Sequence, residues 1–229
     1  MTGIAISLIL LLQSFWREQY VPAARRQRFV AIALGLEAHE YLGLPSQYYS
    51  DQNGTPLYSW RYRIAPYVHS YKRQTHFEVP WSHADNFEWR DVRHPYWVKS
   101  WGDGWGNGEI DNLTDVFAVT GTGTGFGSGG EVGANRLRNL PANLILVVQL
   151  KKNGVDWMQP GDFSVDMGNL NKRLAEQIPS QGGFHVIFAD LTVWRLSSDT
   201  PPTVLRKFMT IELAESHERA LLKPWQDDP

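Results

Sequence analysis

Cysteine is absent from this chain of 229 residues. Its absence excludes disulfides, thiolate nucleophiles and zinc or iron–sulfur sites held by cysteine. An excess of charge of one sign is also missing, because 22 lysines and arginines face 24 aspartates and glutamates, a net charge of −2. Basic residues cluster only at residues 24–28. The electrostatic footprint of a nucleic-acid-binding protein is therefore lacking, and we expect no nucleic-acid partner.

The sequence motifs of common enzyme sites are missing as well. There is no Gly-x-Ser-x-Gly nucleophile elbow, and no Walker lysine follows the glycine-rich stretch at residues 121–130. Gly125, Gly127 and Gly130 formally match Gly-x-Gly-x-x-Gly, but residues 131–135 are a poor helix start, and the dinucleotide fingerprint depends on a helix there. We interpret the stretch as a flexible surface loop, and we predict no enzyme activity, no catalytic residue and no cofactor.

Four histidines raise the question of a metal site. His69, His76 and His83 are spaced by seven residues, and His94 follows. Metal ligands must converge on one point, as they do at i and i+4 on a helix, whereas Pro80 and the turn-like residues after it break any common face. We predict scattered surface histidines and no metal site.

A second polar group could be formed by Gln181, His185 and Asp190, which lie close together in the sequence. An aspartate at a hairpin usually caps its own turn through backbone N–H groups. We therefore interpret Asp190 as a turn residue and not as a catalytic acid.

An uncharged apolar segment occupies residues 4–16. It is short for a free-standing membrane span, which needs about 20 residues. A signal-peptide core, a membrane anchor and a buried helix are the alternatives; the missing basic start and small-x-small site disfavour a signal peptide. Four arginines follow the segment, which leaves the topology open. The side chains expected to pack in lipid or against neighbouring helices are Ile4, Ile6, Leu8, Ile9, Leu10, Leu11, Leu12 and Phe15.

The apolar segment is expected to continue into a long amphipathic helix. Phe29, Ile32, Ala33 and Leu36 recur at helical spacing, and the pattern stops only at Gly43 and Pro45. A helix from residue 3 to 42, kinked at Pro22, would be about 60 Å long. We predict a stem at residues 1–44 and a globular head at residues 45–229.

The head is expected to have an α+β fold, with the stem helix packed on a mainly antiparallel β-sheet. Turn chemistry at residues 50–56 is followed by a short helix within residues 59–71 that ends near Pro66 or just past it, and residues 85–97 are weakly helical. A closing helix or mixed segment is predicted over residues 203–214. Strands are predicted at residues 115–120, 143–150, 184–189 and 192–197, the last two as a hairpin.

Ten tryptophans are unusually many for this length, and most lie between residues 60 and 105. Core packing is the preferred interpretation. The alternative is a carbohydrate- or ligand-binding module in which Trp97, Trp101 and Trp105, on a glycine-rich loop, stack on a flat ligand. Loss of carbohydrate retention on replacing Trp101 and Trp105 would distinguish the two.

Several blocks in order resemble the planctomycete domain-of-unknown-function family 1559, pilin-like proteins with a C-terminal motif of histidine, nine residues, then Asp-Gly. The similar blocks are Val21-Pro22-Ala23-Ala24-Arg25-Arg26, residues 32–41, residues 51–61 including Ser59-Trp60-Arg61, Ala65-Pro66-Tyr67-Val68, Pro80-Trp81-Ser82-His83-Ala84-Asp85-Asn86, residues 115–126, and Gly182-Gly183-Phe184-His185-Val186-Ile187-Phe188-Ala189-Asp190. The resemblance covers nearly the whole chain.

The chain departs from the family at two motif positions. Gln181 replaces the motif histidine, and Leu191 replaces the motif glycine, which argues against the type I′ turn that Asp-Gly favours. The prepilin leader is also not found. The motif positions of interest are Gln181, Gly182, Gly183, Phe184, Asp190 and Leu191.

What the resemblance implies is a membrane-anchored structural or assembly protein, similar to a pseudopilin of type II secretion-like systems. Its N-terminal transmembrane helix would act as a signal-anchor, and its head would be periplasmic or extracellular. The expected partners are the membrane and other pilin-like subunits, and any small-molecule ligand is unknown.

Overall fold

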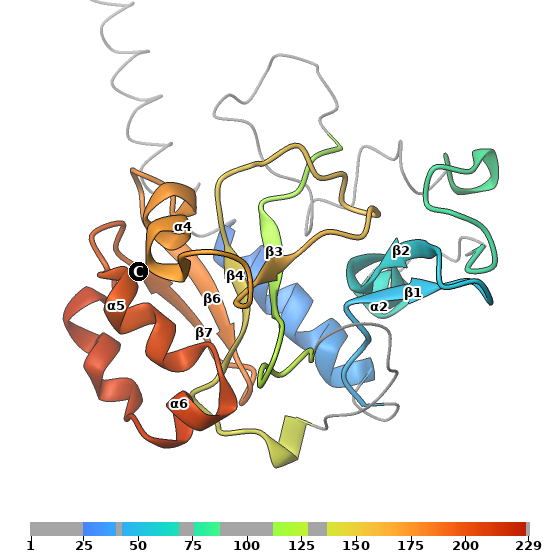
Figure 1. Ribbon diagram of the computed structural model, residues 1–229. Helices are drawn as coiled ribbons and strands as arrows, with labels where there is room; N and C mark the ends of the chain where they lie inside the picture. The colour runs from blue at the N-terminus through green and yellow to red at the C-terminus, as the bar shows by residue number, and fades with distance from the viewer. Residues whose placement is uncertain (1–24, 40–42, 69–75, 88–111, 128–136, 228–229) are drawn as a thin grey trace, which may run out of the picture.

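The computed structural model describes residues 25–39, 43–68, 76–87, 112–127 and 137–227. Within them the chain forms an α+β fold in which an N-terminal helix packs on a mostly antiparallel five-stranded sheet (Figure 1). This agrees with the predicted fold class. The described part of the helix spans residues 25–39, whereas the sequence predicted residues 3–42, and all of that difference lies outside the described residues.

The central sheet has the strand order β5-β3-β4-β6-β7. Its strands are β3 (Val116–Thr120), β4 (Ile145–Gln149), β5 (Phe163–Ser164), β6 (Phe184–Phe188) and β7 (Val193–Leu196). Only the β3–β5 pair is parallel. The predicted strands β3, β4, β6 and β7 are confirmed within one or two residues at their ends, and the two-residue β5 was not predicted.

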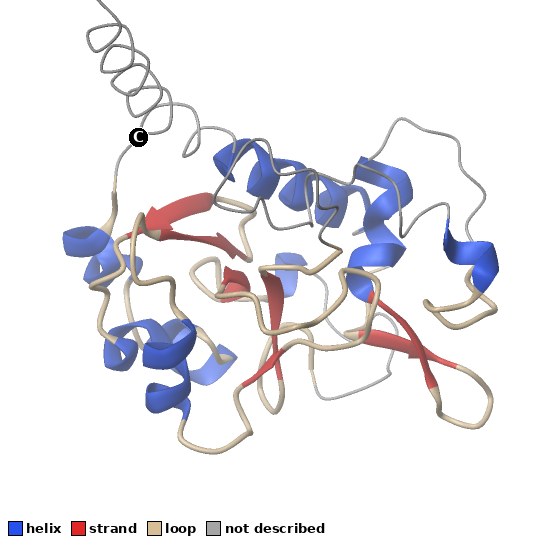
Figure 2. Ribbon diagram, turned by 90° about the horizontal axis from the view of Figure 1, so that it is seen from above, coloured by secondary structure: helices blue, strands red, loops and turns tan. Residues whose placement is uncertain are grey.

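Both faces of the sheet are buried. Alternate residues of β6 face opposite sides, so that Ile187 packs with the N-terminal helix while Phe184 and Val186 pack with the C-terminal helices. In Figure 2 the N-terminal helix and the C-terminal helices lie on opposite sides of the central strands. Because β3, β4 and β6 are covered on both sides, they appear in the sequence as continuous apolar runs and not as alternating ones.

The N-terminal helix contributes a complete apolar stripe to the core. Phe29, Ile32 and Leu36 are fully buried, while Val30 and Leu34 on the opposite face are exposed. At Gly35 a Cβ atom would lie 2.4 Å from Val68 Cγ2, so glycine is needed for the close approach to helix α2 (Trp60–Val68). The described part of the predicted stem, residues 25–39, therefore contributes to the core of the head.

A small hairpin of β1 (Tyr48–Ser50) and β2 (Pro56–Ser59) leads into helix α2 (Trp60–Val68). The predicted turn is confirmed: Asp51 Oδ1 accepts hydrogen bonds from the N–H groups of Asn53 and Thr55, and Gly54 has φ +82°. The helix starts at Trp60 and ends at Val68, just past Pro66, as predicted. The strands on either side of the turn were not predicted.

The β6–β7 hairpin differs from a type I′ turn, as the substitution at its tip suggested. The N–H of Leu191 donates to Phe188 O at 2.9 Å, and the N–H of Phe188 donates to Thr192 O at 3.0 Å, which encloses a three-residue loop. Leu191 has φ +63° and is the one non-glycine residue with positive φ in the described ranges. A leucine therefore occupies the left-handed position that favours glycine in this loop type. Asp190 caps the turn, because its Oδ1 accepts from the N–H of Thr192.

The C-terminal region is helical and covers the second face of the sheet. It contains α4 (Leu170–Gln177), α5 (Pro202–Leu205), α6 (Ile211–Glu215) and the 3₁₀ segment η5 (Arg219–Trp225). The mixed segment predicted for residues 203–214 is confirmed. Helix α4 was not predicted; its start is capped by Asn169, whose side chain accepts from the N–H of Lys172.

Candidate functional site

Two groups of predicted site residues lie outside the described residues. They are the apolar segment from Ile4 to Phe15 and the tryptophans Trp97, Trp101 and Trp105. Both interpretations therefore stay predictions. No helix within the described ranges is long and apolar enough to cross a membrane.

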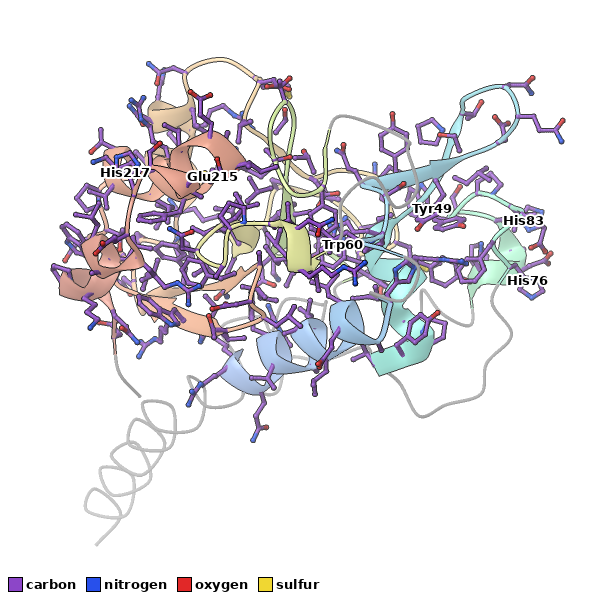
Figure 3. The ribbon with its side chains drawn as sticks, turned by 90° about the horizontal axis from the view of Figure 1, so that it is seen from below. Tyr49, Trp60, His76, His83, Glu215 and His217 are labelled. Atoms are coloured by element: carbon purple, nitrogen blue, oxygen red, sulfur yellow. The ribbon has the colours of Figure 1, made fainter. Side chains whose placement is uncertain are left out.

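The described histidines do not converge on a metal site. His76 and His83 lie at one edge of the molecule, far from His217 at the opposite edge (Figure 3), and each faces its own surface carboxylate, Glu78 or Asp85. His69 and His94 lie outside the residues that the structure describes. Among the described side chains, no group of three potential ligands is found.

The described part of the glycine-rich stretch, residues 121–127, is buried at Thr124, Gly125 and Phe126 and exposed at Thr122 and Gly123, so the prediction of a surface loop holds only in part. Phe126 is buried against Trp60, with ring centroids 5.5 Å apart, and Thr124 Oγ1 donates to Gly121 O. At Gly125 a Cβ would lie 2.4 Å from a methyl group of Leu146. Here glycine allows the close approach of the loop to the core.

The motif positions are split between the two ends of strand β6. Asp190 and Leu191 form the hairpin tip, while Gly182 and Gly183 form the entry to the strand. Gly183 has φ +66°, and a Cβ there would lie 2.6 Å from Leu196 O, so no other residue fits. Gln181 is exposed beside them, and Phe184 is buried in the core. The structure thus separates Gln181 from Asp190.

The entry to β6 meets the N-terminal helix at a buried polar cluster. Arg28 forms an ion pair with Asp115 at the start of β3, and both side chains are at least nine-tenths buried. Gln149, at the end of β4, donates from Nε2 to Asp115 Oδ2 at 2.8 Å, and its Oε1 lies 3.0 Å from His185 Nδ1. We call these four residues the helix–sheet lock, because they tie the helix to three strands.

The hydrogen bonds of the lock define the tautomer of His185. Gln149 Oε1 accepts from the backbone N–H of His185, so the ring nitrogen that faces the same oxygen must also be a donor. Nδ1 therefore carries a proton, and the lowered pKa of the ring keeps it neutral at pH 7. Phe29 stacks on this ring with centroids 5.2 Å apart. Burial, followed by the charges of Arg28, Arg195, Arg25 and Arg26, lowers the pKa of His185 to about 3.

Because the pKa of His185 is lowered in the folded protein, this residue makes the fold less stable as the pH falls. As pH falls below about 6.5 the unfolded chain binds a proton at this residue, but the folded protein does so only near pH 3, so folding stability is lost across that window. Between pH 7 and pH 5 the expected loss is about 2 kcal/mol from this group. His185→Leu should remove that part of the loss, as measured by urea unfolding at both pH values.

Above pH 7 the wild type and the His185→Leu variant should share one pH dependence, because His185 is then neutral in both the folded and the unfolded chain. An equal loss of stability in the two proteins between pH 7 and pH 5 would contradict the assignment.

A second buried polar centre lies at the start of helix α2. All five N–H groups of Arg61 are used: they donate to the carbonyl oxygens of Trp157, Val116, Gln159 and Gly161 and to Asp162 Oδ1. The same Asp162 oxygen accepts from Trp60 Nε1 at 3.0 Å and from the N–H of Ala118 at 2.8 Å. Burial raises the pKa of Asp162 against the opposing attraction of Arg61. The Ser59-Trp60-Arg61 block therefore joins α2 to β3 and to residues 157–162.

The contacts in both buried polar centres anchor one segment of the chain to another. Each carboxylate is neutralised by an arginine, the one histidine is neutral, and the hydroxyl of Ser59 donates to Trp157 O. Neither centre pairs a nucleophile with a base within the described residues. The arrangement can hold segments of the chain together.

Most of these anchoring residues were missed in the sequence. Arg28 was counted only as one of the basic residues that follow the apolar segment, although it lies four residues before Ile32 and eight before Leu36, on the buried stripe of the helix. That spacing is the signal that could have identified it. Asp115, Gln149 and Asp162 carry no such signal, because their partners are distant in the sequence.

Comparison with known proteins found no matching family model, no curated protein and no solved structure similar to this chain.

Proposed function

We propose that this protein is a membrane-anchored structural or assembly protein, similar to a pseudopilin, in which the N-terminal helix fixes the head to an apolar anchor at residues 4–16. The resemblance of several sequence blocks to pilin-like proteins suggests this function. The observation that carries it is the way the helix is held. Its described part is bound to the head both by an apolar stripe and by the helix–sheet lock.

Such attachment suits a head that is held through its N-terminal end. Phe29, Ile32 and Leu36 lie in the same core cluster as Trp60 and Val116, so the helix cannot leave the head without opening the core. The lock adds contacts to β3, β4 and β6. A load applied to the anchor would therefore pass directly into the sheet.

The anchor is proposed from the chemistry of residues 4–16. This segment is uncharged and includes five leucines and isoleucines in succession, Leu8 to Leu12. Each such side chain gains about 1.5–3 kcal/mol when it is removed from water. Its proposed environment is lipid or the equivalent segments of neighbouring subunits. Within the described residues neither buried centre pairs a nucleophile with a base, which supports a structural role over a catalytic one.

Membrane fractionation tests the anchor. The full chain should sediment with membranes and resist extraction at high pH, whereas Leu8→Asp/Leu11→Asp should be released, because a charge at the centre of a membrane segment costs about 3 kcal/mol. The matched control is Met167→Asp/Leu221→Asp, which adds the same charges at exposed apolar positions of the head. Equal solubility of the wild type and the Leu8→Asp/Leu11→Asp variant would refute the proposal.

A further inference from the structure

The face of the N-terminal helix that points away from the sheet has an apolar centre. Val30 is 41% exposed and Leu34 is 58% exposed, and the two side chains are neighbours one turn apart. Among the large apolar side chains that are exposed in the described residues, only these two lie on the same helix. We call the exposed residues of this helix its outer face; they are Arg26, Gln27, Val30, Leu34, Glu37 and Ala38.

The two edges of the outer face differ in charge. At about 3.6 residues per turn, Arg26 and Glu37 lie on one side of the apolar centre, and Gln27 and Ala38 lie on the other. Arg26 and Glu37 are separated by about 16 Å along the helix. Both are exposed, and neither forms an ion pair with a described residue. One edge therefore has a positive end and a negative end, while the other edge is uncharged.

This pattern is complementary to itself when the helix is turned end to end. In an antiparallel pair related by a twofold axis, each helix places an edge beside the same edge of the other helix, and the contacts occur twice. With the axis level with residue 32, Val30 of one copy meets Leu34 of the second copy. Arg26 then lies within about 1.5 Å, measured along the helix, of the level of Glu37 in the second copy. A parallel pair would place the charged edge against the uncharged one, so only the antiparallel pair joins opposite charges.

We propose that the outer face binds a second copy of this chain, with the two helices packed antiparallel through Val30 and Leu34 and with Arg26 paired to Glu37. The inference goes beyond the proposed function and does not rest on the anchor, because the face lies wholly within residues 25–39. Two helices about 22 Å long bury less than the roughly 1,200 Å² of a stable standard interface. The dimer should therefore be weak and should form at high protein concentration.

Cross-linking through single cysteines tests the arrangement, since the chain has no cysteine of its own. Full-length Gln27→Cys and Ala38→Cys, mixed in a mild non-ionic detergent, should be joined to each other by a short bismaleimide, because the two positions lie about 1.5 Å apart along the helix in the proposed pair. Neither variant alone should be linked well, since its two copies would lie about 15 or 18 Å apart along the helix. Equal linking in the mixture and in each variant alone would overturn the pair, as would a yield in the mixture no higher than with exposed Met167→Cys.

Charge reversal in the two cysteine variants tests the contacts themselves. Arg26→Glu should lower the yield of the cross-link on the order of tenfold, because the twofold symmetry makes two contacts repulsive at once. Arg26→Glu/Glu37→Arg should restore the yield, since opposite charges face each other again.

The apolar centre is tested in the same way. Leu34→Asp should abolish the cross-link, while Leu221→Asp, which adds the same charge at an exposed leucine elsewhere on the head, should leave it unchanged. An equal loss in both variants, or no recovery in Arg26→Glu/Glu37→Arg, would contradict the proposed contacts. Such a result would leave the membrane anchor standing, because fractionation tests the anchor through other residues.

Discussion

Replacing Arg28 by methionine should lower the free energy of unfolding of the full chain by about 3–5 kcal/mol, because the substitution leaves the Asp115 carboxylate buried without its cation. Arg28 is 1% exposed and Asp115 is 7% exposed, so water cannot replace the lost partner. Gln149 donates only one hydrogen bond to that carboxylate. Urea unfolding in a mild non-ionic detergent measures the effect.

Two variants make this result specific to the lock. Arg26→Met is the same substitution on the exposed face of the same helix and should change stability by less than about 0.5 kcal/mol. Asp115→Asn combined with Arg28→Met should be more stable than Arg28→Met alone, since the amide carries no charge. If the free energy of unfolding falls no further in Arg28→Met than in Arg26→Met, the ion pair does not hold the helix.

Arg61→Lys should destabilise the protein by about 3–5 kcal/mol although it retains the charge. The guanidinium donates five hydrogen bonds in a fixed fork, to four carbonyl oxygens and to Asp162. Lysine offers three donors at one point, so at least two buried acceptors lose their partner, each at about 1–3 kcal/mol. The loss should appear as a lower midpoint of urea unfolding with an unchanged slope.

Arg63→Lys is the matched control, two residues further along α2. Arg63 lies over the rings of Tyr49 and Phe77, with its guanidinium carbon 5.6 and 4.8 Å from their centroids. A lysine can keep that type of contact, so we expect a loss below about 1 kcal/mol. If the two lysine variants were equally stable, the five hydrogen bonds of the Arg61 guanidinium would not contribute specifically to stability.

The predicted strands were found because burial on both faces leaves a clear local signal. Val116–Thr120, Ile145–Gln149 and Phe184–Phe188 are apolar runs bounded by turn residues, and the hairpin follows from the two residues left between its strands. Helix α2 was found for a similar reason. These elements are determined by residues that are neighbours in the sequence.

The elements and contacts that were missed depend on distant parts of the chain. Strand β5 consists of Phe163 and Ser164 and exists only because it pairs with β3. The partner of Arg28 is 87 residues away, and that of Arg61 is 101 residues away. A buried arginine is indistinguishable from a surface arginine in composition, so only its register on the helix stripe could have separated Arg28 from Arg26.

The Ser59-Trp60-Arg61 block illustrates the same limit at the level of motifs. Sequence resemblance identified the block, but not its role. The structure places all three side chains in the core, with Ser59 and Arg61 both donating to Trp157 O. A motif recognised only from its residue types can belong to a functional site or to the core of the fold. Here the contacts place it in the core.

The environment of the apolar segment in lipid vesicles tests the central claim most directly. Because the chain has no cysteine, a fluorophore such as nitrobenzoxadiazole can be attached to Leu10→Cys alone, with exposed Val30→Cys as the reference position. The anchor predicts that the label at position 10 emits at shorter wavelength and is quenched by nitroxides on the lipid acyl chains, while the label at position 30 is not quenched. A label at position 10 that is blue-shifted but unquenched would place the segment inside the protein, and one that emits as in water would place it in solvent; either result contradicts the anchor.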